Sequence, residues 1–285
     1  MPRYLDPTND FAFQRVFCDK KRLISFLNAI MKLPKGNHIV DLRYIPQEQI
    51  PELIHRKSSL IDIKCKDEAG NVFIVEMQNG YEQHLLKRLQ FYSSSAYTSQ
   101  LGIGSSYGEL DPVFVIVLLR DQVIDPDIPI ISYHKSTEVT SGKHIFTDIA
   151  HVIVELAKFS KSEDALSSEE DYWLYFLSQW SATQDPPKTL QEPAILEAYQ
   201  QLEEFRLSEG EYKAYLDAKT LFEKEVANLE IHYNDGFKKG EEKGIEKGAE
   251  QRNIEIAQSM LADGESVEKI QKWTGLSLEQ INSLQ

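Results

Sequence analysis

Hydrophobic residues along the first 160 positions of the chain follow two spacings. Helical spacing predicts helices over residues 10–17, 20–31 and 81–101. Short apolar or alternating runs predict strands, or segments that contain one, over residues 38–45, 60–65, 72–78, 113–119, 128–133 and 145–156. The order of these elements predicts an α/β fold in which a mixed sheet is flanked by helices.

Beyond Phe159 the pattern becomes helical throughout. The apolar spacing predicts an aromatic-rich helix over residues 171–180, acidic helices within 192–231, and short helices over 256–261, 267–274 and 278–284. We therefore divide the chain into an α/β core (1–160), a helical extension (161–232) and a C-terminal helical module (233–285).

Glycine recurs every four residues in the tail, at Gly236, Gly240, Gly244 and Gly248, with mostly lysine and glutamate between. A period of four traces a drifting stripe on a helix, which lets another helix approach closely. Each glycine also weakens the helix by roughly 1 kcal/mol relative to alanine. The tail is therefore predicted to be either an oligomerisation or regulatory helix, or a solvated charged helix.

Two of the predicted strands have the pattern of a β-hairpin. Residues 60–65 and 72–78 are joined by a polar turn that contains Gly70 and Asn71. If the hairpin is centred on Ala69, with Gly70 at the loop position that requires a positive φ, the numbers of paired residues add to 138. In this register Asp62 lies opposite Glu76.

Strand alternation places Lys64 and Gln78 on the same face as Asp62 and Glu76, and points the other face into a core through Ile61, Ile63, Val75 and Met77. Directly opposed residues have Cβ atoms roughly 4.5–5.5 Å apart. Two carboxylates at that distance repel each other, and a divalent cation between them relieves the repulsion. The pattern predicts a metal site; the alternative is a solvated hairpin that binds no metal.

Charge is distributed unevenly along the 285 residues. The net charge of −14 argues against a nucleic-acid binder, but it divides into +2 for residues 1–120 and −16 for residues 121–285. The half that holds the hairpin is thus compatible with nucleic acid. Two cysteines and seven scattered histidines form no disulfide framework and no zinc motif. The longest apolar run, 113–119, is far below the about 20 residues of a membrane span, so we expect a cytoplasmic protein with no membrane partner.

Several short motifs follow one another along nearly the whole chain. They include residues 6–13 (DPTNDFAF), 25–29 (SFLNA), 62–67 (DIKCKD) and 75–78 (VEMQ), and the pair Arg88 and Tyr92. Together they resemble the PD-(D/E)XK nuclease family transposases, also called Rpn-type recombination-promoting nucleases. The resemblance implies a restriction-endonuclease-like core, with four mixed strands between helices and the active site on a central hairpin. It also implies divalent-metal hydrolysis of DNA phosphodiesters, in recombination, transposition or defence against invading DNA.

The resemblance also implies roles for individual residues. Asp62 and Glu76 match the metal-binding acids of the family, with Mg²⁺ as the expected ion and Mn²⁺ as the alternative. Gln78 stands where most of the superfamily has lysine, so the expected positive charge is missing. Lys64 is a candidate to supply it, the alternative being an exposed strand lysine. Asp10 is a candidate third metal ligand, the alternative being a helix N-cap.

Arg88 and Tyr92 are spaced one helical turn apart and are candidates to contact DNA, at a phosphate and at a sugar or base. The alternative is a tyrosine at the edge of the core beside a surface arginine. Two functions stay open: a metal-dependent DNA endonuclease that forms a homo-oligomer through its tail, and a catalytically weak or inactive relative that binds DNA or protein.

Overall fold

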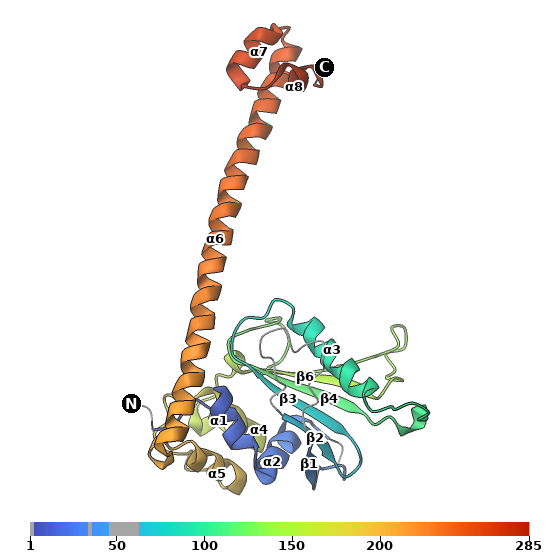
Figure 1. The fold of residues 1–285 in the computed structure, drawn as a ribbon, viewed down its shortest axis with the longest axis vertical. Helices are drawn as coiled ribbons and strands as arrows, with labels where there is room; N and C mark the ends of the chain where they lie inside the picture. The colour runs from blue at the N-terminus through green and yellow to red at the C-terminus, as the bar shows by residue number, and fades with distance from the viewer. Residues whose placement is uncertain (1–2, 34–35, 46–62, 285) are drawn as a thin grey trace. The chain divides into compact units, whose positions relative to one another are not determined.

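The computed structural model describes residues 3–33, 36–45 and 63–284, and its described part contains a six-stranded mixed sheet flanked by helices (Figure 1). The strands are β1 (Leu42–Tyr44), β2 (Ile63–Asp67), β3 (Val72–Gln78), β4 (Val113–Leu119), β5 (Ile131–Lys135) and β6 (Ile149–Glu155). Their order is β1-β2-β3-β4-β6-β5; the β3–β4 and β4–β6 pairs are parallel and the others antiparallel. The predicted α/β class is confirmed, with two strands more than the resemblance implies.

The β2–β3 hairpin has the predicted register. Its four described pairs are Ile63–Val75, Lys64–Ile74, Cys65–Phe73 and Lys66–Val72. The turn forms because Gly70 adopts a φ of +96° and because the Asp67 carboxylate accepts the backbone N–H groups of Ala69 and Asn71 at 3.0 and 2.8 Å. A side chain at Gly70 would also collide with Asp111, since an added Cβ would lie 2.6 Å from its Oδ1.

One face of the sheet packs against helices that precede the strands in the chain and helices that follow them. Ile63, Val75 and Met77 are buried there, as predicted, whereas Ile61 lies outside the described residues. They belong to one apolar cluster with residues of α1 (Asp10–Phe17), α2 (Lys20–Ile30), α4 (Glu169–Ser178) and α5 (Pro193–Gln201). Trp173 of α4 is fully buried and packs its indole ring against Phe17, Phe26 and Phe176.

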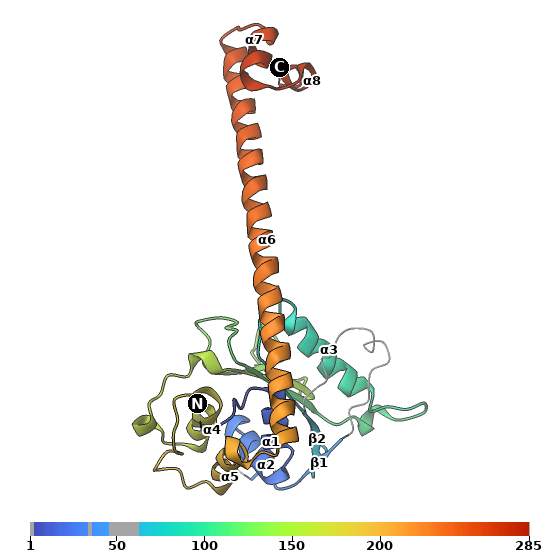
Figure 2. The ribbon, with the colours of Figure 1, turned by 60° about the vertical axis from the view of Figure 1, so that its left-hand side comes forward.

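The other face of the sheet is covered by α3 (Leu85–Thr98), so that α3 and α2 lie on opposite sides of the sheet (Figure 1, Figure 2). The predicted apolar side of this helix is confirmed, because Leu85, Leu89, Tyr92 and Ala96 are all buried. Strand alternation puts Lys64, Glu76 and Gln78 on the α3 face. The polar residues singled out in the hairpin therefore lie between β2, β3 and α3.

Beyond Phe159 the described residues form helices joined by turns, as predicted. The long helix α6 (Glu209–Ala262) is followed by α7 (Val267–Thr274) and α8 (Leu278–Asn282). In the described ranges of the whole chain, 3₁₀ turns occur at Tyr107–Glu109, Leu156–Lys158, Glu163–Ala165 and Glu204–Arg206. The described residues fall into two compact units that divide after Phe222. In the second unit, α7 and α8 form a small core around Ala257, Ile270, Leu276 and Ile281.

Residues 256–261, predicted as a separate short helix, are the last turns of α6 instead. The glycine repeat does not interrupt this helix, because glycine has no steric barrier to helical dihedral angles and its cost is only a weaker helix. Gly264 shortly follows the end of α6 and Gly275 directly follows α7, and both adopt the positive φ that is common after the last turn of a helix. In the described residues no helix combines the length and the apolar character that a membrane span requires.

Candidate active site

Glu76 is a carboxylate in the middle of an interior strand. Only 4% of its surface is exposed, because β2, β4 and α3 surround it. Its Oε1 accepts a hydrogen bond from Arg88 Nη2 at 2.9 Å, whereas the buried Oε2 has no hydrogen-bond partner among the described residues. Burial raises the pKa of Glu76, although the Arg88 charge acts in the opposite direction. A carboxylate oxygen buried without a partner is costly, and a cation bound at it would offset that cost.

Arg88 joins Glu76 to Gln78. From α3 its Nη2 donates to Gln78 Oε1 at 2.5 Å as well as to Glu76 Oε1, and its Nη1 lies 3.6 Å from an Oε2 of Glu82. The other end of the Gln78 amide donates to the Gly80 carbonyl at 3.1 Å. The guanidinium thus puts a positive charge directly beside Gln78, which has none itself.

Tyr92 lies one turn further along α3 and is 3% exposed, so its ring is part of the core. The Arg88 guanidinium carbon lies 5.9 Å from the centre of this ring. Both predicted DNA-contacting residues therefore have protein partners, Arg88 in the ion pair and Tyr92 in the packing. Their contact with DNA stays a prediction.

Asp10 is not the N-cap of α1, which was the alternative to its role as a metal ligand. Asn9, not Asp10, is the N-cap, because it has extended dihedral angles and its side chain accepts from Phe11 N at 3.1 Å. Asp10 is the first helical residue and is exposed. An acid at this position favours the helix dipole. Its role as a metal ligand stays a prediction.

A second polar network, which the sequence did not indicate, joins the N-terminal segment to the ends of β3 and β4. Arg120 pairs with Asp6 at 2.7 Å, and Thr8 donates from Oγ1 to Asp6 at 2.6 Å. Asn79, directly after β3, donates to the Thr8 carbonyl at 2.6 Å. The only signal in the sequence was the motif at residues 6–13, which contains Asp6 and Thr8. These bonds hold the C-terminal end of β3 in place next to the site.

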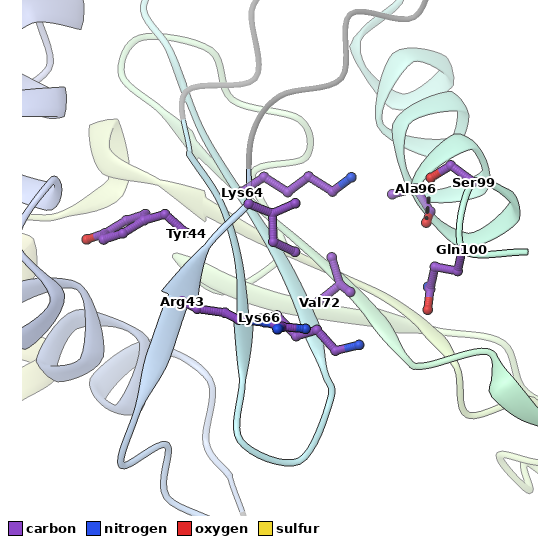
Figure 3. A pocket seen from close by; sticks show the side chains of 9 residues that line it. Arg43, Tyr44, Lys64, Lys66, Val72, Ala96, Ser99 and Gln100 are labelled. Atoms are coloured by element: carbon purple, nitrogen blue, oxygen red, sulfur yellow. Dashed lines mark hydrogen bonds between the residues drawn. The ribbon is translucent and has the colours of Figure 1, made fainter.

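Lys64 projects from β2 on the Glu76 face and lines a cavity of about 380 Å³ (Figure 3). It is half-buried and pairs with Ile74, two residues before Glu76 on β3. Asp62 precedes the first described residue of β2 and lies outside the described residues. The register that predicts its place opposite Glu76 is confirmed at the four pairs of β2 and β3 that are described.

The donor groups suit a hard divalent ion. Within the described residues, no three His, Cys, Asp or Glu side chains gather at metal-binding distance. Glu76 nevertheless offers a charged oxygen that has no hydrogen-bond partner in the described ranges, and Gln78 lies two residues along on the same face. Because Mg²⁺ is usually held by one or two carboxylates and retains several waters, this donor set fits it.

Ionised Glu76 is expected to lower the stability of the metal-free protein. Since its pKa is raised on folding, the stability that it contributes is fully present below the pKa of the unfolded chain and is lost as pH rises through the folded pKa. Glu76→Gln is therefore expected to raise the melting temperature at neutral pH and to remove this part of the pH dependence. Thermal unfolding in chelator at a series of pH values measures both; a variant that melts at or below wild type at every pH contradicts the prediction.

The comparison with known proteins gives a family match over most of the chain. A family model described as PD-(D/E)XK nuclease family transposase matches residues 7–228. No curated protein and no solved structure matches. The matched range includes the hairpin, α3 and the polar network at the ends of β3 and β4.

Proposed function

The chain belongs to the PD-(D/E)XK nuclease family transposases, and from this membership we propose that it is a metal-dependent DNA endonuclease that hydrolyses phosphodiester bonds. The observation that carries the proposal is the Glu76 carboxylate, which is buried on a central strand with Oε2 unpaired among the described residues and with a guanidinium at Oε1. Burying such a group is costly unless a cation meets it. A metal bound at Oε2 meets that requirement.

Glu76 would hold Mg²⁺, or Mn²⁺ in its place, together with Asp62, which enters on the sequence pattern alone. When bound, the ion lowers the pKa of a coordinated water and stabilises the charge that develops on the phosphate. Arg88 acts as a positioning residue: it holds Oε1 of Glu76 and leaves Oε2 for the ion. It also orients the Gln78 amide, whose carbonyl oxygen it binds.

Arg88 supplies a positive charge at the site. This charge comes from α3 and not from the strand position of Gln78, where most of the superfamily has lysine. Lys64 is the second candidate for this charge, from the neighbouring strand. Asp10 is proposed as a further ligand only on the resemblance. A lysine at the position of Gln78 would bring one charge; here Arg88 places it within hydrogen-bond distance of both Glu76 and Gln78.

A second function is favoured by the same Gln78. Since its side chain is neutral and already satisfied by Arg88 and Gly80, the site has no lysine at that strand position to act on a water or a phosphate. The alternative is a catalytically weak or inactive relative that binds DNA or protein.

A plasmid assay separates the two functions. The full chain is incubated with supercoiled DNA over a titration of Mg²⁺ and of Mn²⁺, with chelator as the control. We expect nicked or linear plasmid only in the presence of metal. Retarded but uncut DNA at every metal concentration would support the binding protein instead. The family description associates the chain with transposition, and we expect it to act on DNA in the cytoplasm, in recombination, transposition or defence.

The tail is proposed to make the protein a homo-oligomer. In the described part of α6, an added Cβ at Gly240, Gly244 or Gly248 would meet no atom within 4 Å, which leaves this stripe open to another helix. We expect light scattering to give a multiple of the chain mass for the full protein, and a monomer mass for a protein that ends at His232. Equal association in both, with equal activity, would contradict the proposal.

A further inference from the structure

A cavity lies on the same sheet face as Glu76, toward the β1 edge of the sheet. Three cationic side chains line it from the strands, Arg43 from β1 and Lys64 and Lys66 from β2, and its opposite wall includes Ser99 and Gln100 after α3 (Figure 3). We call Arg43, Lys64 and Lys66 the strand cations. The metal site gives no role to Arg43 or Lys66, and it involves Lys64 only as the second candidate for the charge that Arg88 already provides next to Glu76.

The strand register forces the strand cations together. Arg43 is directly opposite Lys66 across the β1–β2 ladder, and Lys64 lies two residues before Lys66 on the same face of β2. Like charges directly opposite each other on neighbouring strands are destabilising. Placing three cations side by side therefore lowers the stability of this part of the sheet.

The described surroundings neutralise only one of these charges. Lys66 forms an ion pair with Asp111, the residue that precedes Pro112 and β4. Arg43 and Lys64 form no ion pair with any residue in the described ranges. The nearby end of α3 contributes at most about half of a negative elementary charge. Counted over the described residues that line it, the cavity thus keeps a net positive charge, which favours an anion.

The position of the strand cations favours a polyanion over a single small anion. Lys66 pairs with Val72, which lies four residues before Glu76 on β3. At about 3.3 Å per strand residue, this separation is about 13 Å. It corresponds to about four nucleotide steps measured along the axis of a B-form duplex, where each strand carries one phosphate per roughly 3.4 Å of axis.

We infer that Arg43, Lys64 and Lys66 bind the phosphate backbone of the DNA strand that leads into the Glu76 site. The inference rests on the proposed function for the identity of the polyanion, but not for its hydrolysis. The three side chains contact phosphates and carry no sequence information. Asp111 weakens this contact, because it neutralises Lys66.

The test measures DNA binding in chelator, where no cleavage takes place. Fluorescence anisotropy with a labelled duplex gives the dissociation constant over a series of salt concentrations. The triple variant Arg43→Gln, Lys64→Gln, Lys66→Gln is expected to bind more weakly, and its salt dependence is expected to fall by about one unit of log–log slope for each charge removed. Asp111→Asn is expected to bind several-fold more tightly than wild type.

Two controls separate charge from folding. Lys135→Gln removes one positive charge from an exposed site on β5, at the other edge of the sheet. This variant is expected to bind DNA like wild type. The charge-conserving variant Arg43→Lys, Lys64→Arg, Lys66→Arg is expected to keep the wild-type slope. Because the neutral triple variant loses the repulsion between Arg43 and Lys66, a melting temperature at or above that of wild type shows that it is folded.

The outcomes distinguish this inference from the proposed hydrolysis. The inference is supported if the salt-dependence slope falls for the neutral triple variant and stays at the wild-type value for both controls. This holds whether or not the plasmid is cut. A triple variant that binds with the wild-type constant and slope overturns the inference, even if wild type cleaves DNA. A wild-type chain that binds no duplex at low salt overturns it as well.

Discussion

Glu76→Gln is expected to reduce the rate of DNA cleavage by about 10³-fold or more. The change keeps the size of the side chain, but it removes the only charge with which a described side chain of β3 can hold a divalent ion. Metal stabilisation of the reacting phosphate contributes several kcal/mol, and each 1.36 kcal/mol corresponds to a factor of ten in rate. Initial rates of plasmid nicking at saturating Mg²⁺ measure the loss.

The matched control is Glu209→Gln, an exposed carboxylate at the first residue of α6 and outside the proposed oligomerisation segment. It is expected to cut at the wild-type rate. Asp62→Asn is expected to lose as much activity as Glu76→Gln, because the hairpin register assigns the two acids to one site. Wild-type cleavage by both Glu76→Gln and Asp62→Asn would refute the metal site, and calorimetry would then show Mg²⁺ binding unchanged in both variants.

The hairpin was predictable because its determinants are local. The turn between β2 and β3 depends on Asp67 and on the positive φ of Gly70, and both lie within the turn. Once the turn is fixed, the register follows, and with it the face on which Glu76 lies. The burial of α3 was predictable for a similar reason, since four residues at helical spacing define one apolar side.

The partners of the polar residues were not predictable in the same way. Arg88 is 12 positions from Glu76, and its contact with that carboxylate depends on how α3 packs on the sheet. The sequence nevertheless contained one signal: Arg88 directly precedes Leu89, which belongs to the buried side of α3. That side of the helix faces the strand that carries Glu76. Asp6 and Arg120 are 114 positions apart, and no periodicity connects them.

The order of the strands also exceeded what the pattern contains. β6 lies between β4 and β5 although it follows both in the chain. The apolar runs of β4 and β6 indicate strands buried on both faces, which is typical of parallel pairs, but they do not indicate which strand is the neighbour. The strand cations come together because β1 pairs with β2, and the pattern of the chain does not indicate this pairing either, so the sequence alone did not suggest a phosphate contact there.

Arg88→Ala is expected to lower cleavage at neutral pH by roughly 10–100-fold, which is the usual effect of removing a residue that orients a metal ligand. The Arg88 charge lowers the pKa of Glu76 and opposes the effect of burial. Without it the pKa of Glu76 rises further, so a proton competes with the metal for the carboxylate. Activity of this variant is therefore expected to recover as the pH is raised, and rates over a range of pH at fixed Mg²⁺ measure the recovery.

Two further variants separate positioning from packing. Arg88→Lys keeps the charge but cannot reach both Glu76 and Gln78 with one planar group, so it is expected to keep the wild-type pH profile at a reduced rate. Glu76→Gln is expected to show no recovery at high pH, because it has no carboxylate to ionise. If Arg88→Ala loses the same fraction of activity at every pH, Arg88 supports the fold of α3 on β3 and does not set the charge of Glu76.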